Sequence, residues 1–237
     1  MESATGASKA VRRRRITGLQ EERQLWDAGH ARVAGVDEVG MGPLAGPVVA
    51  AAVVFMPGAR RLRGIADSKL MTRRARERSA AVIRARAIAV GIGIVEPEEI
   101  DRLNIYHAGL KAMRLAIGAL PVVPDHLLVD SRRVPELDIP QTRCMHGDAW
   151  VYSIAAASIV AKVTRDEIMR RADGAFPLYG FRRHVGYATR EHLAALRAFG
   201  PTPLHRRSFA PCARAEESLG PCVSRDEPPS DPVAVQS

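Results

Sequence analysis

The sequence predicts an α/β domain with a mixed central sheet, flanked by helices and followed by a small C-terminal helical appendage. Three observations predict this fold. Two apolar strands joined by a glycine- and proline-rich turn come first, as in a hairpin. Strands and helices then alternate, which is typical of parallel pairing through helical crossovers. An amphipathic helix comes last, near the C-terminus.

The individual elements follow from apolar patterns and from the residues that interrupt them. Short aliphatic runs bounded by Gly, Pro or Asp predict strands over residues 31–36, 48–55, 88–95, 126–129 and 140–145. Helical spacing predicts helices over residues 72–87, 98–120, 148–172 and 189–199. Pro121 ends the second helix, and Thr189 is the expected N-cap of the last.

The two ends of the chain differ in composition from the rest. Residues 1–17 are a basic arm and residues 213–237 an acidic, Pro-rich tail, and we expect both to be disordered. The catalytic domain with its appendage then covers residues 18–212. Three cysteines without paired spacing argue against a disulfide framework or a zinc site. They indicate a reducing cytoplasm instead. No apolar stretch is long enough to span a bilayer. We also expect the protein to be a monomer.

The net charge indicates a polyanionic partner. The chain carries +9, of which residues 1–17 contribute +4 and residues 214–237 contribute −3, leaving +8 on the body between them. A basic body is typical of nucleic-acid-binding proteins, although many basic proteins bind none.

Four acids lie at the ends of predicted elements: Asp37 and Glu38 after the first strand, Asp130 at the end of another, and Asp148 before a helix. Adjacent strand residues point to opposite faces, so both members of the first pair can reach one ion only where the strand ends or bulges. Gly40 and Gly42 supply that irregularity. Each acid has an ordinary alternative role: an acidic turn, a strand-to-turn residue and a helix N-cap.

Four carboxylates brought together repel, and their pKa values would rise unless cations joined them. An oxygen-only set suits Mg²⁺ or Mn²⁺. Two such ions about 4 Å apart stabilise the attacking and leaving oxygens of a phosphoryl displacement, and one activates water. On the following helix, Ser158 and Lys162 share a face, and Lys162 would offset the carboxylates. This chemistry is typical of nucleases.

Several separated motifs resemble ribonuclease HII in order and spacing, over residues 31–211. They are GVDEVGMGPLAGPVVAAAVV from residue 35, DSK at 67–69, LNIYHA at 103–108, the Asp130 strand, HGD at 146–148, AAASIVAKVTRD at 155–166, YGFRRHVGY at 179–187 and LHRRSF at 204–209. The resemblance implies an RNase H-like fold and cleavage of the RNA strand of RNA–DNA hybrids, and of DNA on the 5′ side of single ribonucleotides. It also implies that Asp37, Glu38, Asp130 and Asp148 bind the metal ions.

The same resemblance implies contacts with the substrate. Gly40, Met41 and Gly42 would read the ribonucleotide 2′-hydroxyl, and Tyr187 would pack on the deoxyribose at the RNA-to-DNA junction. Ser68 and Lys69 would contact phosphate. His184, with Arg182 and Arg183, is expected along the substrate groove, unless this is a solvated basic loop. The family usually carries Arg or Lys where this chain has Met41, which removes a charge near phosphate.

Three other functions stay open at this point. Ribonuclease HIII would normally add a large N-terminal domain, whereas only about thirty residues precede the first strand. A catalytically weakened protein that binds RNA–DNA hybrids would explain Met41, but all four acids are present. A phosphate-ester hydrolase of another fold would share the acids but not Tyr187 or the DSK segment.

Overall fold

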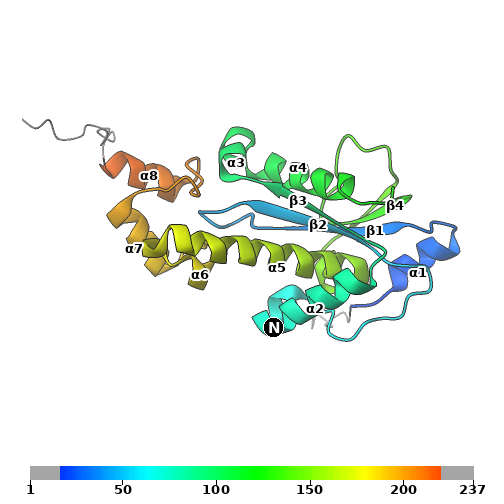
Figure 1. Cartoon of the computed structure of the whole chain (residues 1–237). Helices are drawn as coiled ribbons and strands as arrows, with labels where there is room; N and C mark the ends of the chain where they lie inside the picture. Colours follow the sequence, from blue (N-terminus) through cyan, green and yellow to red (C-terminus); the bar gives the residue numbers. More distant parts are fainter. Residues whose placement is uncertain (1–16, 220–237) are drawn as a thin grey trace, which may run out of the picture.

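The computed structural model describes residues 17–219, and these form one mixed sheet with helices on both faces (Figure 1). The strand order is β3-β2-β1-β4-β5. β1 pairs antiparallel with β2, β2 pairs antiparallel with β3, and β4 runs parallel to both β1 and β5. The strands are β1 (Val33–Val39), β2 (Val48–Val54), β3 (Ala89–Val95), β4 (His126–Asp130) and β5 (Gln141–Cys144). The predicted fold class is confirmed.

The helices divide between the two faces and one end of the sheet (Figure 1). They are α1 (Gln20–Asp27), α2 (Arg73–Arg86), α3 (Pro97–Leu103), α4 (Ile105–Gly118), α5 (Tyr152–Ala175), α6 (Phe181–His184), α7 (Arg190–Phe199) and α8 (Ala210–Leu219), with short 3-10 turns η1 (Ser68–Leu70), η2 (Gly147–Ala149) and η3 (Pro177–Tyr179). α6, α7 and α8 form the predicted appendage. No helix within residues 17–219 is long and apolar enough to cross a membrane.

Strand alternation decides which helix each strand residue meets. Val36 and Ala50 face α4 in one core, whereas Val49 and Ala51 face α5 in a second core on the other side of the sheet. α5 approaches β1 closely, because a Cβ on Gly35 would lie 2.2 Å from the backbone of Ser153. The long helix α5 therefore rests directly on the strand that carries Asp37.

Two predicted helices differ from those observed. The helix expected over 98–120 is two helices, because Asn104 has φ 68° and its Oδ1 accepts hydrogen bonds from the N–H groups of Tyr106 and His107, which caps α4. The helix expected from 148 begins at Tyr152, after the turn η2. Apolar spacing continues through both breaks, so it could not reveal them.

The C-terminal boundary also needs correction. The expected disordered tail from residue 213 is wrong for its first part, because α8 continues to Leu219 and buries Cys212 against Leu196. Residues 1–16 and 220–237 lie outside the described residues, so disorder there remains an expectation. The predicted cap of α7 is confirmed: Thr189 Oγ1 accepts a hydrogen bond from the N–H of His192 at 3.2 Å.

Candidate active site

The first two acids lie within β1, and they point to opposite faces of the sheet. Asp37 is on the α5 side, where Ser158 hydrogen-bonds to it, and Glu38 is on the α4 side, near Arg132. Both remain paired with β2, so the expected strand end or bulge at these acids is wrong. Instead, pairing with β4 stops at Val36, which leaves one edge of β1 open at the acids.

Asp130 comes to the same open edge from β4. Its strand pairs with β1 up to the partners Val36 and Val129, so Asp130 follows directly beside Asp37. Asp130 Oδ1 accepts a hydrogen bond from the N–H of Gly147 at 2.6 Å. A Cβ on Gly147 would lie 2.6 Å from the end of the Ile154 side chain and 3.0 Å from Cys144 Cβ, so a larger residue would displace these side chains.

Asp148 does not cap the helix that follows it. The N-cap of α5 is Val151, which has no side-chain cap, so this alternative is wrong. Asp148 is buried, and its Oδ2 accepts a hydrogen bond from the Lys69 ammonium at 2.7 Å. Asp37, Glu38, Asp130 and Asp148, which we call the carboxylate cluster, therefore come together from β1, β4 and η2.

Burial and mutual repulsion raise the proton affinity of the cluster. Burial, followed by repulsion from Glu38 and Asp130, raises the pKa of Asp37 well above its usual range. Burial raises the pKa of Glu38 to about 7, although Arg132 opposes the shift. Burial also raises the pKa of Asp130, against the hydrogen bond from Gly147. The cluster thus has more negative charge than its surroundings neutralise.

A divalent cation fits this deficit. Glu38 Oε2 is buried without a hydrogen-bond partner among the described residues. The Lys69 ammonium lies against Asp148, in the kind of contact that a metal ion would make with this carboxylate. No three of the described His, Cys, Asp and Glu side chains converge closely enough to enclose an ion in the conformation seen. Carboxylates without a metal ion repel one another, and Lys69 holds Asp148. A spread arrangement of the four carboxylates is therefore expected before metal ions bind.

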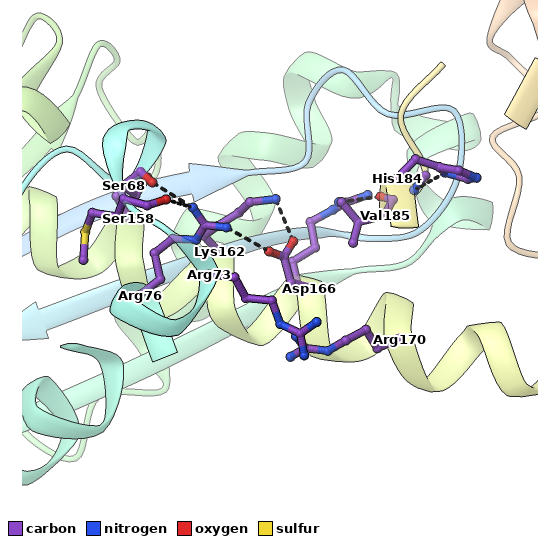
Figure 2. A network of polar contacts seen from close by, with 12 residues as sticks. Ser68, Arg73, Arg76, Ser158, Lys162, Asp166, Arg170, His184 and Val185 are labelled. Atoms are coloured by element: carbon purple, nitrogen blue, oxygen red, sulfur yellow. Dashed lines mark hydrogen bonds and ion pairs between the residues drawn. The ribbon is translucent and has the colours of Figure 1, made fainter. Parts of the chain in front are cut away.

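The Ser68–Lys69 turn is held against the cluster by a polar network (Figure 2). Ser68 is buried and its Oγ lies 3.0 Å from Ser158 Oγ. Arg76 donates to the carbonyls of Ser68 (3.1 Å) and Met71 (2.6 Å) and lies 3.8 Å from Asp166. The structure thus brings Ser68, Lys69 and Ser158 to the cluster, with Ser158 buried behind Asp37.

Residues 40–47, which we call the glycine turn, are held by two buried arginines. Arg206 is fully buried and donates to the carbonyls of Gly40 (2.6 Å), Met41 (3.2 Å), Pro43 (2.8 Å) and Gly46 (2.8 and 3.0 Å). Arg165, also fully buried, donates to Ala45 and Pro47, both at 2.9 Å. Neither guanidinium has a carboxylate within ion-pair distance among the described residues, so both serve as carbonyl binders.

Sequence reasoning missed the role of these arginines. Arg165 and Arg206 lie inside the motifs at 155–166 and 204–209, but nothing in those motifs distinguishes them from the exposed Arg207 next door. Only the fold brings residue 206 beside residue 40. Because no carboxylate among the described residues pairs with these arginines, their positive charge is unfavourable where it is buried. Burial, followed by repulsion from Arg165, lowers the pKa of Arg206 to about 9.

Tyr187 lies on a loop fastened to the glycine turn. The N–H of Leu44 donates to the carbonyl of Gly186 at 2.8 Å, and Arg165 donates to the carbonyl of Val185 at 2.9 Å. The Tyr187 ring is 44% exposed, with the Lys162 ammonium 5.6 Å from its centroid. Tyr187 thus presents an open ring face beside the turn, and Lys162, held at 2.6 Å by Asp166, flanks it.

The expected position of His184 along the groove is wrong. Its ring is buried, with Nε2 2.8 Å from the carbonyl of Tyr179 and Nδ1 accepting a hydrogen bond from the N–H of Gly186. His184 also stacks on His192, with ring centroids 4.4 Å apart. It therefore shapes the loop that carries Tyr187, whereas Arg182 and Arg183 are exposed.

Met41 packs onto α4, on the same face of the sheet as Glu38. A Cβ on Gly109 would lie 3.0 Å from Met41 Sδ and 3.7 Å from Arg132 Nη1, so both side chains reach this part of α4. Arg132 lies over the Tyr106 ring at 4.9 Å and 3.9 Å from Glu38. A cation therefore stands close to Met41, although Met41 itself carries none.

Comparison with known proteins identifies the family. The family model described as Ribonuclease HII matches residues 34–212. The chain is 54% identical over 202 residues to ribonuclease HII of Anaeromyxobacter sp. (strain Fw109-5), covering 85% of this chain and 63% of that one. It is 53% identical over 212 residues to ribonuclease HII of Geobacillus thermodenitrificans (strain NG80-2), covering 90% and 80%.

A solved structure supports the fold independently. The crystal structure of the ribonuclease H2 from Pyrococcus horikoshii OT3 aligns with a TM-score of 0.71 and 26% identity, covering 79% of this chain and 98% of that one. Together with the family match over most of the described residues, this rules out a hydrolase of another fold. The chain belongs to the ribonuclease HII family, whose members are ribonuclease H enzymes.

Proposed function

We propose that this chain is an endonuclease that hydrolyses the RNA strand of RNA–DNA hybrids and cuts on the 5′ side of single ribonucleotides in duplex DNA. The products would carry a 3′-hydroxyl and a 5′-phosphate. The observation that carries the proposal is the placement of four carboxylates, three of them with raised pKa values, beside a glycine turn held by two buried arginines and an exposed tyrosine. Membership of the ribonuclease HII family supports it.

The carboxylate cluster would hold two divalent cations, Mg²⁺ or Mn²⁺, which suit oxygen ligands. When bound, such ions activate water and stabilise charge on the attacking and leaving oxygens of the phosphodiester. Asp37 and Asp130 would share the edge between β1 and β4, and Glu38 and Asp148 would complete the set. Lys69 would then exchange Asp148 for a substrate phosphate, since its side chain is largely exposed to solvent.

The glycine turn would read the 2′-hydroxyl. Its carbonyls are bound by Arg165 and Arg206, whereas the N–H groups of Met41 and Gly42 donate no hydrogen bond within residues 17–219. Free donors on a backbone that cannot shift are suited to a small hydroxyl. Tyr187 would pack on the neighbouring deoxyribose, because an extra 2′-hydroxyl there would disturb the contact with the ring.

The test is cleavage of a labelled DNA duplex that contains one ribonucleotide, with Mn²⁺, with Mg²⁺ and with chelator. We expect metal-dependent cutting on the 5′ side of the ribonucleotide and none of an all-DNA duplex. Cutting of long hybrids alone would refute the reading of single ribonucleotides. Absence of cutting on both substrates, with binding retained, would instead identify a protein that only binds hybrids.

A further inference from the structure

The charge of the chain body is concentrated in one stretch, residues 60–86, which we call the arginine segment. It carries ten basic residues against Asp67 and Glu77, a net charge of +8. The body as a whole also carries +8, so the rest of the body is neutral. Concentrated charge of one sign repels itself and attracts polyanions.

The arginine segment presents much of this charge to solvent. α2 buries Ser79, Ala80 and Ile83 on the side that faces the α5 core. Since residues in a helix are rotated by about 100°, Arg74 and Arg78 lie on the opposite side. Six exposed arginines form no hydrogen bond or ion pair through their side chains within residues 17–219; they are Arg60, Arg61, Arg63, Arg74, Arg78 and Arg86.

Other side chains of α2 fix its orientation. Arg73 and Arg170 both bind Glu77, at 2.9 and 3.0 Å, and Arg84 donates to Thr164 Oγ1 on α5 at 3.0 Å. Figure 2 shows Arg73, Arg76 and Arg170 gathered on the side of α2 that faces α5. Because these contacts hold α2 on α5, the outward direction of Arg74 and Arg78 is a fixed property of the fold.

The arginine segment is also continuous with the active site. It includes the turn that delivers Lys69 to Asp148, and Arg76 joins α2 to that turn through the carbonyls of Ser68 and Met71. α2 has 14 residues, hence a length of about 21 Å, or roughly six base pairs of duplex. A cationic surface of this length therefore extends from the site of cleavage.

We infer that the arginine segment binds the phosphate backbone of the duplex flanking the cut, an inference that rests on the proposed function. Guanidinium groups pair with phosphate oxygens without regard to base sequence, as a nuclease that cuts at many sites requires. Arg74 and Arg78 are one turn apart, and within residues 17–219 they have no acidic partner to compete with phosphate. The contact adds affinity outside the site that the carboxylate cluster and the glycine turn form.

The experiment compares Arg74→Gln/Arg78→Gln with the control Arg23→Gln/Arg143→Gln. The control removes two exposed arginines from α1 and β5, so it causes the same change in net charge. Binding is measured with chelator present, so that nothing is cut, on a ribonucleotide-containing duplex with long flanks and on one trimmed to a few base pairs. Dissociation constants are determined across a range of salt concentrations, and thermal unfolding checks that both variants are folded.

We expect the test variant to lower the slope of log Kd against log salt by about 0.9 for each arginine that contacts a phosphate. Most of the affinity gained from long flanks should disappear, whereas the control should keep it. Equal slopes and equal flank effects in the two variants would overturn the inference. If the wild-type chain cuts nothing but the variants still differ in slope, the proposed function fails and the duplex-binding surface stands.

Discussion

Asp37 and Glu38 of the carboxylate cluster are separated in sequence from the glycine turn only by Val39, yet the cluster and the turn are held in opposite ways. The cluster is anionic and under-neutralised, and burial raises the pKa of three of its members. The glycine turn carries no charge, and two cationic side chains bind six of its carbonyls. The cluster therefore keeps negative charge that its surroundings do not neutralise, whereas the carbonyls of the glycine turn already have cationic donors.

This difference suggests separate tasks: the cluster would carry out the cleavage, and the glycine turn would select the substrate. A cluster that changes when ions bind can tolerate small displacements, because the ions draw the carboxylates into place. A backbone that must recognise one hydroxyl gains from a fixed conformation before binding, since ordering it later would cost affinity. Substitutions in the cluster should therefore abolish turnover on every substrate. Substitutions that loosen the backbone of the turn should change the ratio between substrates.

The largest effect is expected from Asp37→Asn. The substitution removes a proposed metal ligand from the cluster, and metal ions contribute several kcal/mol to catalysis. Turnover should therefore fall on the order of 10³-fold or more on both hybrids and single-ribonucleotide duplexes. Duplex affinity measured with chelator should change little, because the positive surfaces remain. The control is Asp27→Asn on exposed α1; retained turnover in Asp37→Asn would disprove this assignment of the site.

Arg206→Lys should come next, and it tests the turn. A lysine offers three donors on one atom, so it cannot span four carbonyls that the guanidinium binds from Gly40 to Gly46. We expect kcat/KM to fall about tenfold or more on the single-ribonucleotide duplex, which corresponds to a loss of about 1.4 kcal/mol of transition-state stabilisation. The fall on long hybrids should be smaller. Arg207→Lys, at the exposed neighbouring position, is the matched control.

A purely structural role for Arg206 would give a different result. Thermal unfolding of Arg206→Lys should show a folded protein with a lower midpoint, because buried carbonyls lose hydrogen bonds. If kcat/KM falls equally on both substrates, in proportion to the loss of folded protein, Arg206 stabilises the fold but does not affect substrate selection by the turn. The measurement is therefore the ratio of the two substrates, with the folded fraction held constant.

How far the sequence alone could predict these two regions also differs. The acids could be singled out from the sequence, because Asp37, Glu38 and Asp130 directly follow apolar runs and the four together form an oxygen-only set. The guanidinium–carbonyl contacts were not, since Arg206 is 166 residues from Gly40 and its local pattern resembles that of Arg207. The burial of His184 was missed for the same reason: a Gly-rich basic loop looks exposed until its packing partners are known.

Tyr187→Ala should give a smaller and more selective effect. The substitution removes a ring that lies beside the glycine turn and would contact one deoxyribose. Base or sugar packing on an aromatic ring is worth about 1–3 kcal/mol, so single-ribonucleotide cutting should fall by roughly tenfold or more. Cutting of long hybrids should fall less. Tyr187→Phe keeps the ring and should retain the preference; an equal loss on both substrates in Tyr187→Ala would argue against junction sensing.

The under-neutralised cluster also predicts how stability depends on pH. Because the folded pKa of Glu38, about 7, is above its ordinary 4.5, the folded state holds more protons between these values than the unfolded state does. The unfolding midpoint, measured with chelator, should therefore fall as pH rises through this window. Glu38→Gln should make the decline shallower, and added Mn²⁺ should reverse it above pH 7 in the wild type. An unchanged slope in Glu38→Gln would show that the pKa of Glu38 is not raised in the folded state.

Met41→Arg should have the smallest effect, and it asks whether the turn needs a charge of its own. Met41 packs near Gly109, and Arg132 already places a cation there, 3.9 Å from Glu38. A second guanidinium should strengthen duplex binding at low salt and steepen its salt dependence by up to about 0.9, the value for one phosphate contact. The substrate ratio should stay constant, because the turn reads the hydroxyl through its backbone. A changed ratio would show that the side chain at position 41 takes part in selection.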